Sequence, residues 1–347
     1  MPLVRIATHL LAAVALVSAL PAGAQTPAGK IDDAALRQLP FAQYTDFVTL
    51  AVNVIPVSEG PAGRVVVLTD PAGRIGGLVV AHVPPDVAGP DAGVTLVDSA
   101  YPQAVPAVRA ALATITARAV GTVINTHWHV DHTNGNTAWA ADGADAPGAL
   151  IVAHDNVRVR RAAVAEIKAF GETYPPLPAA ALPRITYATS LVLRSGGETI
   201  TLHHARGHTD GDTLVHFARA NVIALGDLCF GRQYPFLDLD AGGGWAGLMA
   251  GIDLALSLAD EATAFVPGHL LPTDPRSPVL TTAEVQAYRA MLGEVAARVQ
   301  AARARGASLA ETIAAQPLKD LEADWFRSAA VTSASVIAMA WRGGVAD

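Results

Sequence analysis

The feature that most constrains the fold of this chain is a series of short, valine-rich apolar runs separated by Gly, Pro and Asp. Residues 47–99 contain "FVTLAVNVIPV", "RVVVLTD", "GGLVVAHV" and "GVTLVDS", and this punctuation is typical of consecutive β-strands. Residues 189–230 contain a second series, "TSLVLRS", "ETITLHHARG", "TLVHFARA" and "NVIALGDLCF". Helical spacing of apolar residues follows each series. We therefore predict an α/β fold in which two β-sheets pack face to face with helices outside, an αββα sandwich.

The segments between and after these runs complete the predicted order of elements. Helices are expected where apolar residues recur at helical spacing, and strands where short apolar runs end in Gly, Asp or Pro. The predicted helices are 32–39, 103–115, 156–170, 247–260 and 282–306, and the further strands are 119–126, 149–155 and 262–269. The Pro-rich stretch 173–183 is expected to be a surface loop.

The first 24 residues differ from the rest of the chain. They contain an early Arg5, an apolar run from Leu10 to Leu20 and then the triplet Ala22-Gly23-Ala24. This pattern predicts a secretory signal peptide cleaved after Ala24, because the apolar run is too short for a membrane anchor. We expect a periplasmic or secreted protein without stable insertion in a membrane.

Charge and cysteine content narrow the classes of partner. The formal net charge is −7, and no cluster of Lys and Arg is present. Such a surface argues against nucleic acid as a partner and leaves a small-molecule substrate as the expectation. The single cysteine, Cys229, cannot form a disulfide within the chain.

The stretch "INTHWHVDHTNGN" concentrates ligand-type side chains at the end of a predicted strand. It holds His127, His129, Asp131 and His132. Imidazole and carboxylate groups are the ligands that zinc takes in proteins. The alternative, a solvated or pH-sensitive loop, is disfavoured because further candidates of the same chemistry follow downstream.

Three later strands end in a residue of the same kind. His208 lies in "ARGHTDGDT", Asp227 in "VIALGDLCF" and His269 in "AFVPGH". Functional side chains tend to lie in loops at such positions. The chain thus offers five imidazoles and two carboxylates, which is too many for one metal ion and suits two.

These motifs, in the order "THWHVDH", "GHTDGDT", "LGDLCF" and "VPGH", resemble those of the metallo-β-lactamase fold superfamily of hydrolases. Together with the signal peptide at 1–24 and the polar lead-in at 25–44, the resemblance implies a catalytic domain at 45–275. It leaves 276–347 as a C-terminal helical extension packed on the same domain. The αββα fold of the family agrees with the strand pattern.

The resemblance also implies the role of each candidate ligand. In the glyoxalase-like arrangement of the family, His127, His129 and His208 would hold one metal ion. Asp131, His132 and His269 would hold the second ion, and Asp227 would bridge the two. This set differs from that of the lactamase subclass that uses a cysteine on its second metal.

The implied activity is hydrolysis of an ester, thioester, lactone or amide by hydroxide bound to two zinc ions, with iron or manganese as alternative metals. A metal lowers the pKa of its water to about 7, so hydroxide exists at neutral pH. Asp131 would also orient the nucleophile, which makes it the candidate catalytic residue. β-Lactams belong to this set of substrates, and we expect the activity on them to be weak.

Two other readings of the same motifs remain open. Some relatives with a similar first motif are persulfide dioxygenases that use a single iron with fewer ligands. A third reading is a non-catalytic periplasmic metal-binding or quinoprotein-accessory protein. Metal content and turnover distinguish the three.

Several residues carry weaker signals. Cys229 is expected to fill space in the core, and Thr209, Asp210 and Asp212 to cap the turn that carries His208. His154 suits a hydrogen bond near the site or plain packing equally well. Arg232 and Tyr234 would either line the substrate cleft or belong to a surface loop.

Overall fold

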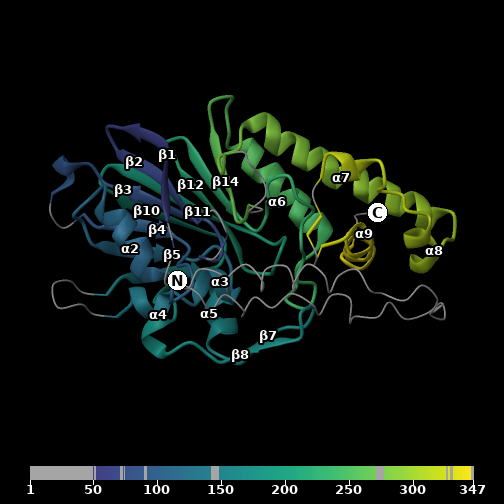
Figure 1. Ribbon diagram of the computed structural model, residues 1–347, viewed down its shortest axis with the longest axis horizontal. Coiled ribbons are helices and arrows are strands. Elements are labelled where there is room, and N and C mark those ends of the chain that lie inside the picture. Colours follow the sequence, from purple (N-terminus) through teal and green to yellow (C-terminus); the bar gives the residue numbers. More distant parts are fainter. Residues whose placement is uncertain are drawn as a thin grey trace, which may run out of the picture. The chain divides into compact units, whose positions relative to one another are not determined.

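Two β-sheets form the middle of the molecule in this computed structural model (Figure 1). The structure describes residues 50, 52–70, 73, 75–89, 92–141, 148–270, 277–325, 327–328 and 331–344. All of them belong to one folded unit, residues 33–347. The predicted signal peptide, the lead-in 25–44 and the helix expected at 32–39 lie outside the described residues.

Within the described residues, the first sheet has seven strands in the order β1-β2-β3-β4-β5-β6-β9. Strands β1 to β4 are paired antiparallel, whereas β4, β5, β6 and β9 run parallel. Their bounds are β1 (Asn53–Gly60), β2 (Gly63–Thr69), β3 (Val79–Val83), β4 (Val94–Val97), β5 (Val120–Ile124), β6 (Leu150–His154) and β9 (Ile185–Tyr187).

The second sheet has five strands in the order β10-β11-β12-β13-β14, again counted over the described part of the chain. The first four are paired antiparallel, and β14 joins β13 in parallel. The bounds are β10 (Ser190–Ser195), β11 (Glu198–Ala205), β12 (Asp212–Phe217), β13 (Val222–Gly226) and β14 (Ala264–Pro267). A separate antiparallel hairpin pairs β7 (Ala165–Ile167) with β8 (Glu172–Tyr174).

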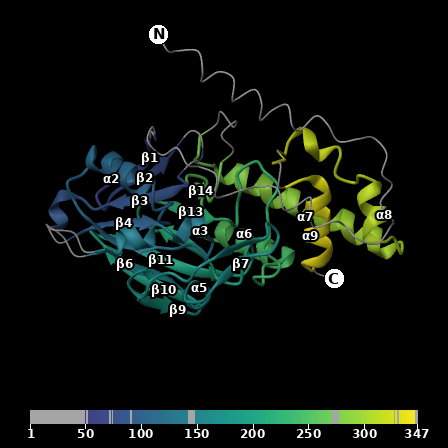
Figure 2. The same ribbon diagram turned by 60° about the horizontal axis from the view of Figure 1, so that its bottom comes forward.

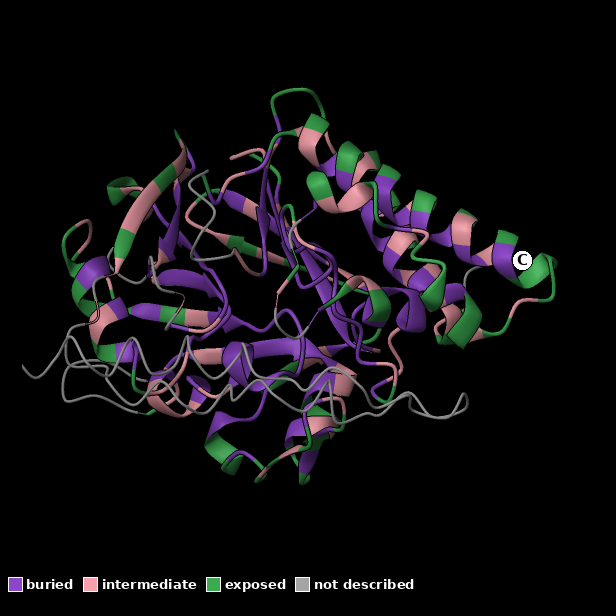
Figure 3. Ribbon diagram, turned by 45° about the vertical axis from the view of Figure 1, so that its right-hand side comes forward, coloured by how far each residue is buried: buried purple, intermediate pink, exposed green. Residues whose placement is uncertain are grey.

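Helices lie outside the sheets (Figures 1 and 2). Figure 3 shows α7 with a buried face and an exposed face, whereas the strands in the middle are mostly buried. The α-helices are α2 (Val105–Ala113), α3 (Val130–Thr133), α4 (Asn136–Trp139), α5 (Asp155–Arg161), α6 (Trp245–Ser257), α7 (Thr282–Ala304), α8 (Leu309–Ala314) and α9 (Ser333–Arg342). Short 3-10 turns are η2 (Asp86–Ala88), η3 (Ala179–Ala181) and η4 (Leu321–Ala323).

Alternation along the strands separates the core into layers. In β2, Val65 and Val67 face the second sheet, whereas Val66 and Leu68 pack towards α2. In β13, Val222 belongs to the cluster between the sheets, whereas the next residue, Ile223, packs among residues of α6, α7 and α9. Because both faces of the central strands such as β2 and β13 are covered, these strands read as continuous apolar runs, whereas the edge strand β10 alternates exposed and half-buried residues. The predicted αββα sandwich is confirmed.

The predicted helix over 156–170 is wrong in its second half. Helix α5 ends at Arg161, and Ala165–Ile167 forms strand β7. The alanines suit a helix, but Ala165 and Ile167 alternate with the exposed Glu166, and this spacing of two buries both on one face of the hairpin. The predicted loop 173–183 likewise begins within β8 and contains η3.

The arrangement of the strands brings their carboxyl ends to one edge. Strands β5, β11, β13 and β14 are each followed within three residues by a predicted ligand, and these are His127, His208, Asp227 and His269. Across the described residues, no helix is both long and apolar enough to cross a membrane.

Candidate metal centre

The histidine-rich motif folds as a turn between β5 and α3. The backbone N–H of Thr126 donates to the Asp98 carboxylate at 2.7 Å, which anchors the chain as it leaves β5. His129 is the residue that precedes α3, so the next turn of the chain carries Asp131 and His132. A strand followed at once by a short helix therefore points ligand-type side chains of one motif towards two neighbouring positions.

The first group of metal-ligand atoms comprises His127, His129, His208 and Asp227. Nε2 of His208 lies 2.9 Å from Nδ1 of His129. Oδ2 of Asp227 lies 3.5 Å from Nε2 of His208 and 3.9 Å from Nε2 of His127. All four side chains are buried.

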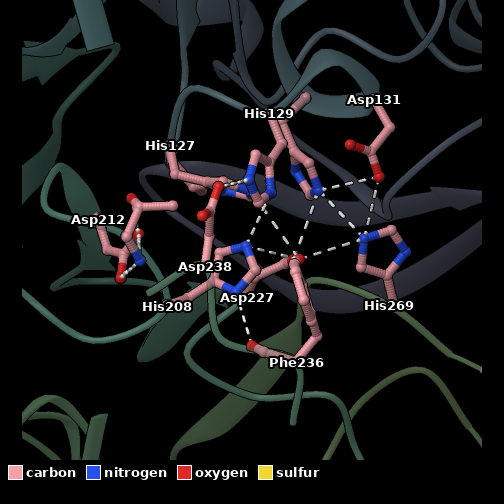
Figure 4. Close-up of polar contacts among 12 residues, drawn as sticks. His127, His129, Asp131, His208, Asp212, Asp227, Phe236, Asp238 and His269 are labelled. Carbon is pink, nitrogen blue, oxygen red and sulfur yellow. Dashed lines mark hydrogen bonds and ion pairs between the residues drawn. The ribbon is translucent and has the colours of Figure 1, made fainter. Parts of the chain in front are cut away.

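The second group comprises Asp131, His132 and His269. Nε2 of His269 lies 3.1 Å from Nε2 of His132 and 3.2 Å from Oδ2 of Asp131. Asp227 reaches this group as well, because its Oδ1 lies 3.4 Å from Nε2 of His132 and its Oδ2 lies 3.4 Å from Nε2 of His269. Figure 4 shows the Asp227 carboxylate between His208 and His269.

The hydrogen bonding of the centre fits a divalent metal. Nε2 of His127 and Oδ1 of Asp227 are buried and form no hydrogen bond. Burying such atoms without a partner costs free energy of about 1–3 kcal/mol each. The facing nitrogens of His129 and His208 also lack a proton between them, because each ring donates from its other nitrogen, to Asp238 and to the Phe236 carbonyl. Metal ions in the two groups would satisfy all these lone pairs.

Four of the five histidines fix their second ring nitrogen on a protein acceptor. This hydrogen bond sets the tautomer and orients the ring of a metal-binding histidine. The pairs are His127 Nδ1 with Thr126 Oγ1 at 3.1 Å, His129 Nε2 with Asp238 Oδ2 at 3.0 Å, His132 Nδ1 with Asp98 Oδ2 at 2.7 Å, and His208 Nδ1 with the Phe236 carbonyl at 2.8 Å.

Asp98 and Asp238 are partners that the sequence analysis missed. Asp98 follows β4 with a φ of 64°, a left-handed conformation that is uncommon outside glycine. It accepts from the Thr126 hydroxyl as well as from His132. The one available signal was position, because Asp98 ends an apolar run just as Asp227 does.

Asp212 holds the turn that carries His208, as predicted for the Thr209-Asp212 segment. Its carboxylate accepts from the backbone N–H groups of Gly207, at 3.1 Å, and of Thr209. Burial raises the pKa of Asp212 to about 7, although these hydrogen bonds oppose the shift. Asp210 instead forms an ion pair with Arg160 at 2.6 Å.

Burial and charge set the protonation of the centre. Burial lowers the pKa of His208 to about 4, against the attraction of Asp227, so this imidazole is neutral at pH 7. Burial opposes ionisation of Asp227, but the neighbouring histidines outweigh it and hold its pKa well below the usual range. His269 shows the reverse balance, because Asp227 and Asp131 overcome burial and raise its pKa to about 9. The centre is therefore built around ionised carboxylates.

The second group is the more accessible one. The side chain of His269 is 24% exposed, whereas those of His127, His132 and His208 are at most 1% exposed. The ring of Phe230 stacks on His269 with centroids 5.8 Å apart. His269 is therefore the side of the centre that is open to solvent, next to the ring of Phe230.

The remaining candidates lie apart from the two groups. Cys229 is buried, and burial raises the pKa of its thiol to about 12, which agrees with a packing role. The ring of His154 stacks on the ring of His204 with centroids 3.9 Å apart. Its Nε2 donates to the Ala188 carbonyl, and its Nδ1 accepts from the Asn156 N–H. Arg232 is exposed, and Tyr234 is buried in the core rather than open to a cleft.

Comparisons with known proteins agree with this geometry. Residues 87–272 match the family model of the metallo-beta-lactamase superfamily. A comparison with curated proteins finds no match. Among solved structures, the chain is similar to a metallo-beta-lactamase from Pontibacter korlensis, with 16% identity and a TM-score of 0.50 over 70% of this chain and 99% of that one. It is also similar to the inverting sec-alkylsulfatase Pisa1 from Pseudomonas sp., with 14% identity and a TM-score of 0.61 over 83% of this chain and 50% of that one. At these identities the likeness shows the fold alone.

Asp238→Asn tests the outer partners of the centre. We expect zinc affinity to fall about 10- to 100-fold, because the amide is a weaker acceptor for the His129 ring N–H. Competition with a chromophoric zinc chelator measures the affinity. Asp240→Asn is the matched control, since Asp240 is exposed and pairs with Lys168. Equal affinities in the two variants would contradict the role of Asp238.

Proposed function

Because the chain belongs to the metallo-beta-lactamase superfamily, we propose that it is a hydrolase that works with two zinc ions held by seven side chains. Sequence motifs and geometry select the same residues. His127, His129 and His208 bind one ion in this proposal. Asp131, His132 and His269 would hold the second ion, and Asp227 would be shared between the two groups.

The single observation that carries the proposal is the position of Asp227. Its two oxygens lie within 3.5 Å of ligand-type nitrogens from both groups. A carboxylate shared in this way suits two adjacent cations. A mononuclear iron centre, the alternative drawn from the sequence, needs fewer ligands and leaves the second group unexplained.

The side chains of the centre have distinct tasks in the proposed reaction. When bound, the two ions would supply Lewis acidity and lower the pKa of a water molecule towards neutrality. Asp131 then accepts a hydrogen bond from the attacking water and directs it towards the substrate. His127 and His208 stay neutral and buried, and they exclude bulk water from the far side of the centre.

The proposed substrates carry a carbonyl group: an ester, thioester, lactone or amide, with β-lactams as weak substrates. Two zinc ions carry four positive charges, and Asp131, Asp227 and one hydroxide would return three. The remaining positive charge favours a substrate that is anionic or that develops negative charge at the carbonyl oxygen. Access past His269 and Phe230 supports a substrate with an apolar part near the reacting bond.

A hydrolysis panel tests the proposed reaction. Zinc-loaded protein is expected to turn over at least one substrate among nitrocefin, aryl esters, lactones and thioesters. Chelation should abolish the activity and zinc should restore it. Asp131→Ala should lower kcat/KM at least about 100-fold, because a positioned acid–base group contributes at least that much.

Asp86→Ala is the control for the panel, because Asp86 is exposed in η2 and lies outside both ligand groups. Its activity should equal that of the wild type. Turnover that survives chelation, or no turnover on any substrate by protein loaded with two zinc ions, would overturn the proposed function.

We also propose export from the cytoplasm, which rests on the signal-peptide pattern of residues 1–24. The protein recovered from the periplasm or the medium should begin at Gln25, which N-terminal sequencing shows directly. An intact N-terminus in the exported fraction, or recovery only from the cytoplasm, would contradict this expectation.

A further inference from the structure

Arg161 is a buried cation that the metal centre does not use. It is the last residue of α5, and its exposed fraction is 1%. Nη2 donates to Oδ1 of Asn134 at 2.8 Å, whereas Nε and Nη1 are buried and form no hydrogen bond. Among the residues that the structure describes, no carboxylate forms an ion pair with this guanidinium. Two of its three nitrogens therefore lack an acceptor.

Such an arrangement is costly without a ligand. Burial lowers the pKa of Arg161 to about 10, so the group remains charged at pH 7. A buried charge that lacks a counter-charge costs several kcal/mol, and buried guanidinium groups are normally paired. The neutral amide of Asn134 accepts one hydrogen bond from the guanidinium but does not balance its positive charge. An anion is the partner that this environment calls for.

The surroundings of Arg161 place it beside the accessible side of the centre. Asn134 directly follows α3 (Val130–Thr133), the helix that carries Asp131 and His132. Arg161 lies at the base of the β7–β8 hairpin, because its backbone carbonyl accepts from the N–H of Leu177, three residues after β8. Tyr174 of β8 interacts electrostatically with both Asp131 and Arg161. The hydroxyl of Tyr174 donates to Glu172 in the same hairpin strand.

The hairpin also connects with the other wall of the centre. Phe170, at the hairpin turn, packs against Phe236 with ring centroids 4.8 Å apart. Phe236 in turn stacks on the ring of His129 at 6.3 Å. The turn of the β7–β8 hairpin therefore reaches the first ligand group through Phe236, and Arg161 lies at the base of the hairpin.

We infer that Arg161 and Asn134 form a binding site for an anionic group, a carboxylate or a sulfate, at the base of the β7–β8 hairpin and next to α3, the helix that carries Asp131. This inference rests on the proposed function in one respect: the anion would be part of the substrate that is hydrolysed at the centre. Arg161 is 1% exposed, so an anion that binds its guanidinium is shielded from bulk water. Pairing then takes place away from water, where charge-assisted hydrogen bonds are strong.

The first arm of the test measures anion binding without any turnover. The probe is sodium sulfate, compared with sodium chloride at equal ionic strength, and the readout is the thermal unfolding midpoint of zinc-loaded protein. Sulfate should raise the midpoint of the wild type in a saturable way, since a ligand of the native state stabilises it. Arg161→Met should lose this rise. Arg158→Met, from the exposed face of the same helix, should keep it.

The variant itself discriminates between a binding role and a structural role. Replacing an unpaired buried cation with an apolar side chain of similar length is expected to leave the midpoint without sulfate unchanged or higher. A large fall in that midpoint for Arg161→Met would mean that Arg161 is structural and would overturn the inference. The loss of the sulfate effect in a stable variant supports it.

The second arm identifies the source of the anion. Arg161→Met should raise KM for an ester with a carboxylate tail about 10- to 100-fold, the effect of losing hydrogen bonds to a charged group. KM for the matching neutral ester and kcat for both should not change. Arg158→Met should leave all of these values as in the wild type.

The two arms separate the inference from the proposed function. A sulfate effect that requires Arg161, without turnover of any ester, would retain the anion site and reject the hydrolase. Turnover with no difference between Arg161→Met and Arg158→Met in either arm would reject the anion site and retain the hydrolase. A sulfate effect confined to Arg161, with equal KM changes for both esters, would overturn the assignment to the substrate.

Discussion

The whole site depends on a buried carboxylate, Asp227, that lies between two groups of histidines. Its oxygens are within 3.5 Å of nitrogens from His132, His208 and His269. Burial alone would favour the neutral acid, and the surrounding imidazoles reverse this preference. An ionised carboxylate at this depth requires positive charge nearby, and the convergent imidazole lone pairs require the same. The two metal ions of the proposed function would meet both needs.

The fold provides this convergence through strand direction. The ligands follow β5, β11, β13 and β14, so the last residue of each strand sets the position of one side chain or one motif. Close backbone contacts maintain these positions. A side chain at Gly268 would place its Cβ 2.0 Å from Oδ1 of Asp227, and one at Gly77 would approach the His132 ring at 2.5 Å. The glycines therefore let the loops of both sheets close on the centre.

Most of the fold and all seven candidate ligands follow from local patterns in the sequence. Buried strands in a four-layer sandwich are apolar on both faces. The segments "RVVVLTD" and "NVIALGD" can therefore be recognised as strands from the sequence alone, without knowledge of the strands they pair with. The hairpin β7–β8 is different, because its short strands are buried by tertiary contacts such as that between Phe170 and Phe236. The carboxylates that hydrogen-bond the ligand histidines, Asp98 and Asp238, could not be predicted from local sequence patterns either. Asp238 lies 109 residues from His129 in the chain, and no local spacing links them.

The two ligand groups differ in their exposure to solvent, so the centre has a buried side and an accessible side. The first group is buried, whereas the second is partly exposed at His269, and Arg161 contacts Asn134 at the end of the helix that carries Asp131 and His132. A substrate held between these features would present its reacting bond to Asp131 with its anionic end on the guanidinium. In the proposed function, the ligand set would determine the reaction, and the hairpin side of the centre would select the substrate.

Anomalous X-ray diffraction at the zinc edge, from crystals of the zinc-loaded protein, tests the central claim most directly. We expect two peaks per chain, one among His127, His129 and His208 and the other among Asp131, His132 and His269, with Asp227 in contact with both. A single peak, or peaks away from these residues, would contradict the binuclear centre.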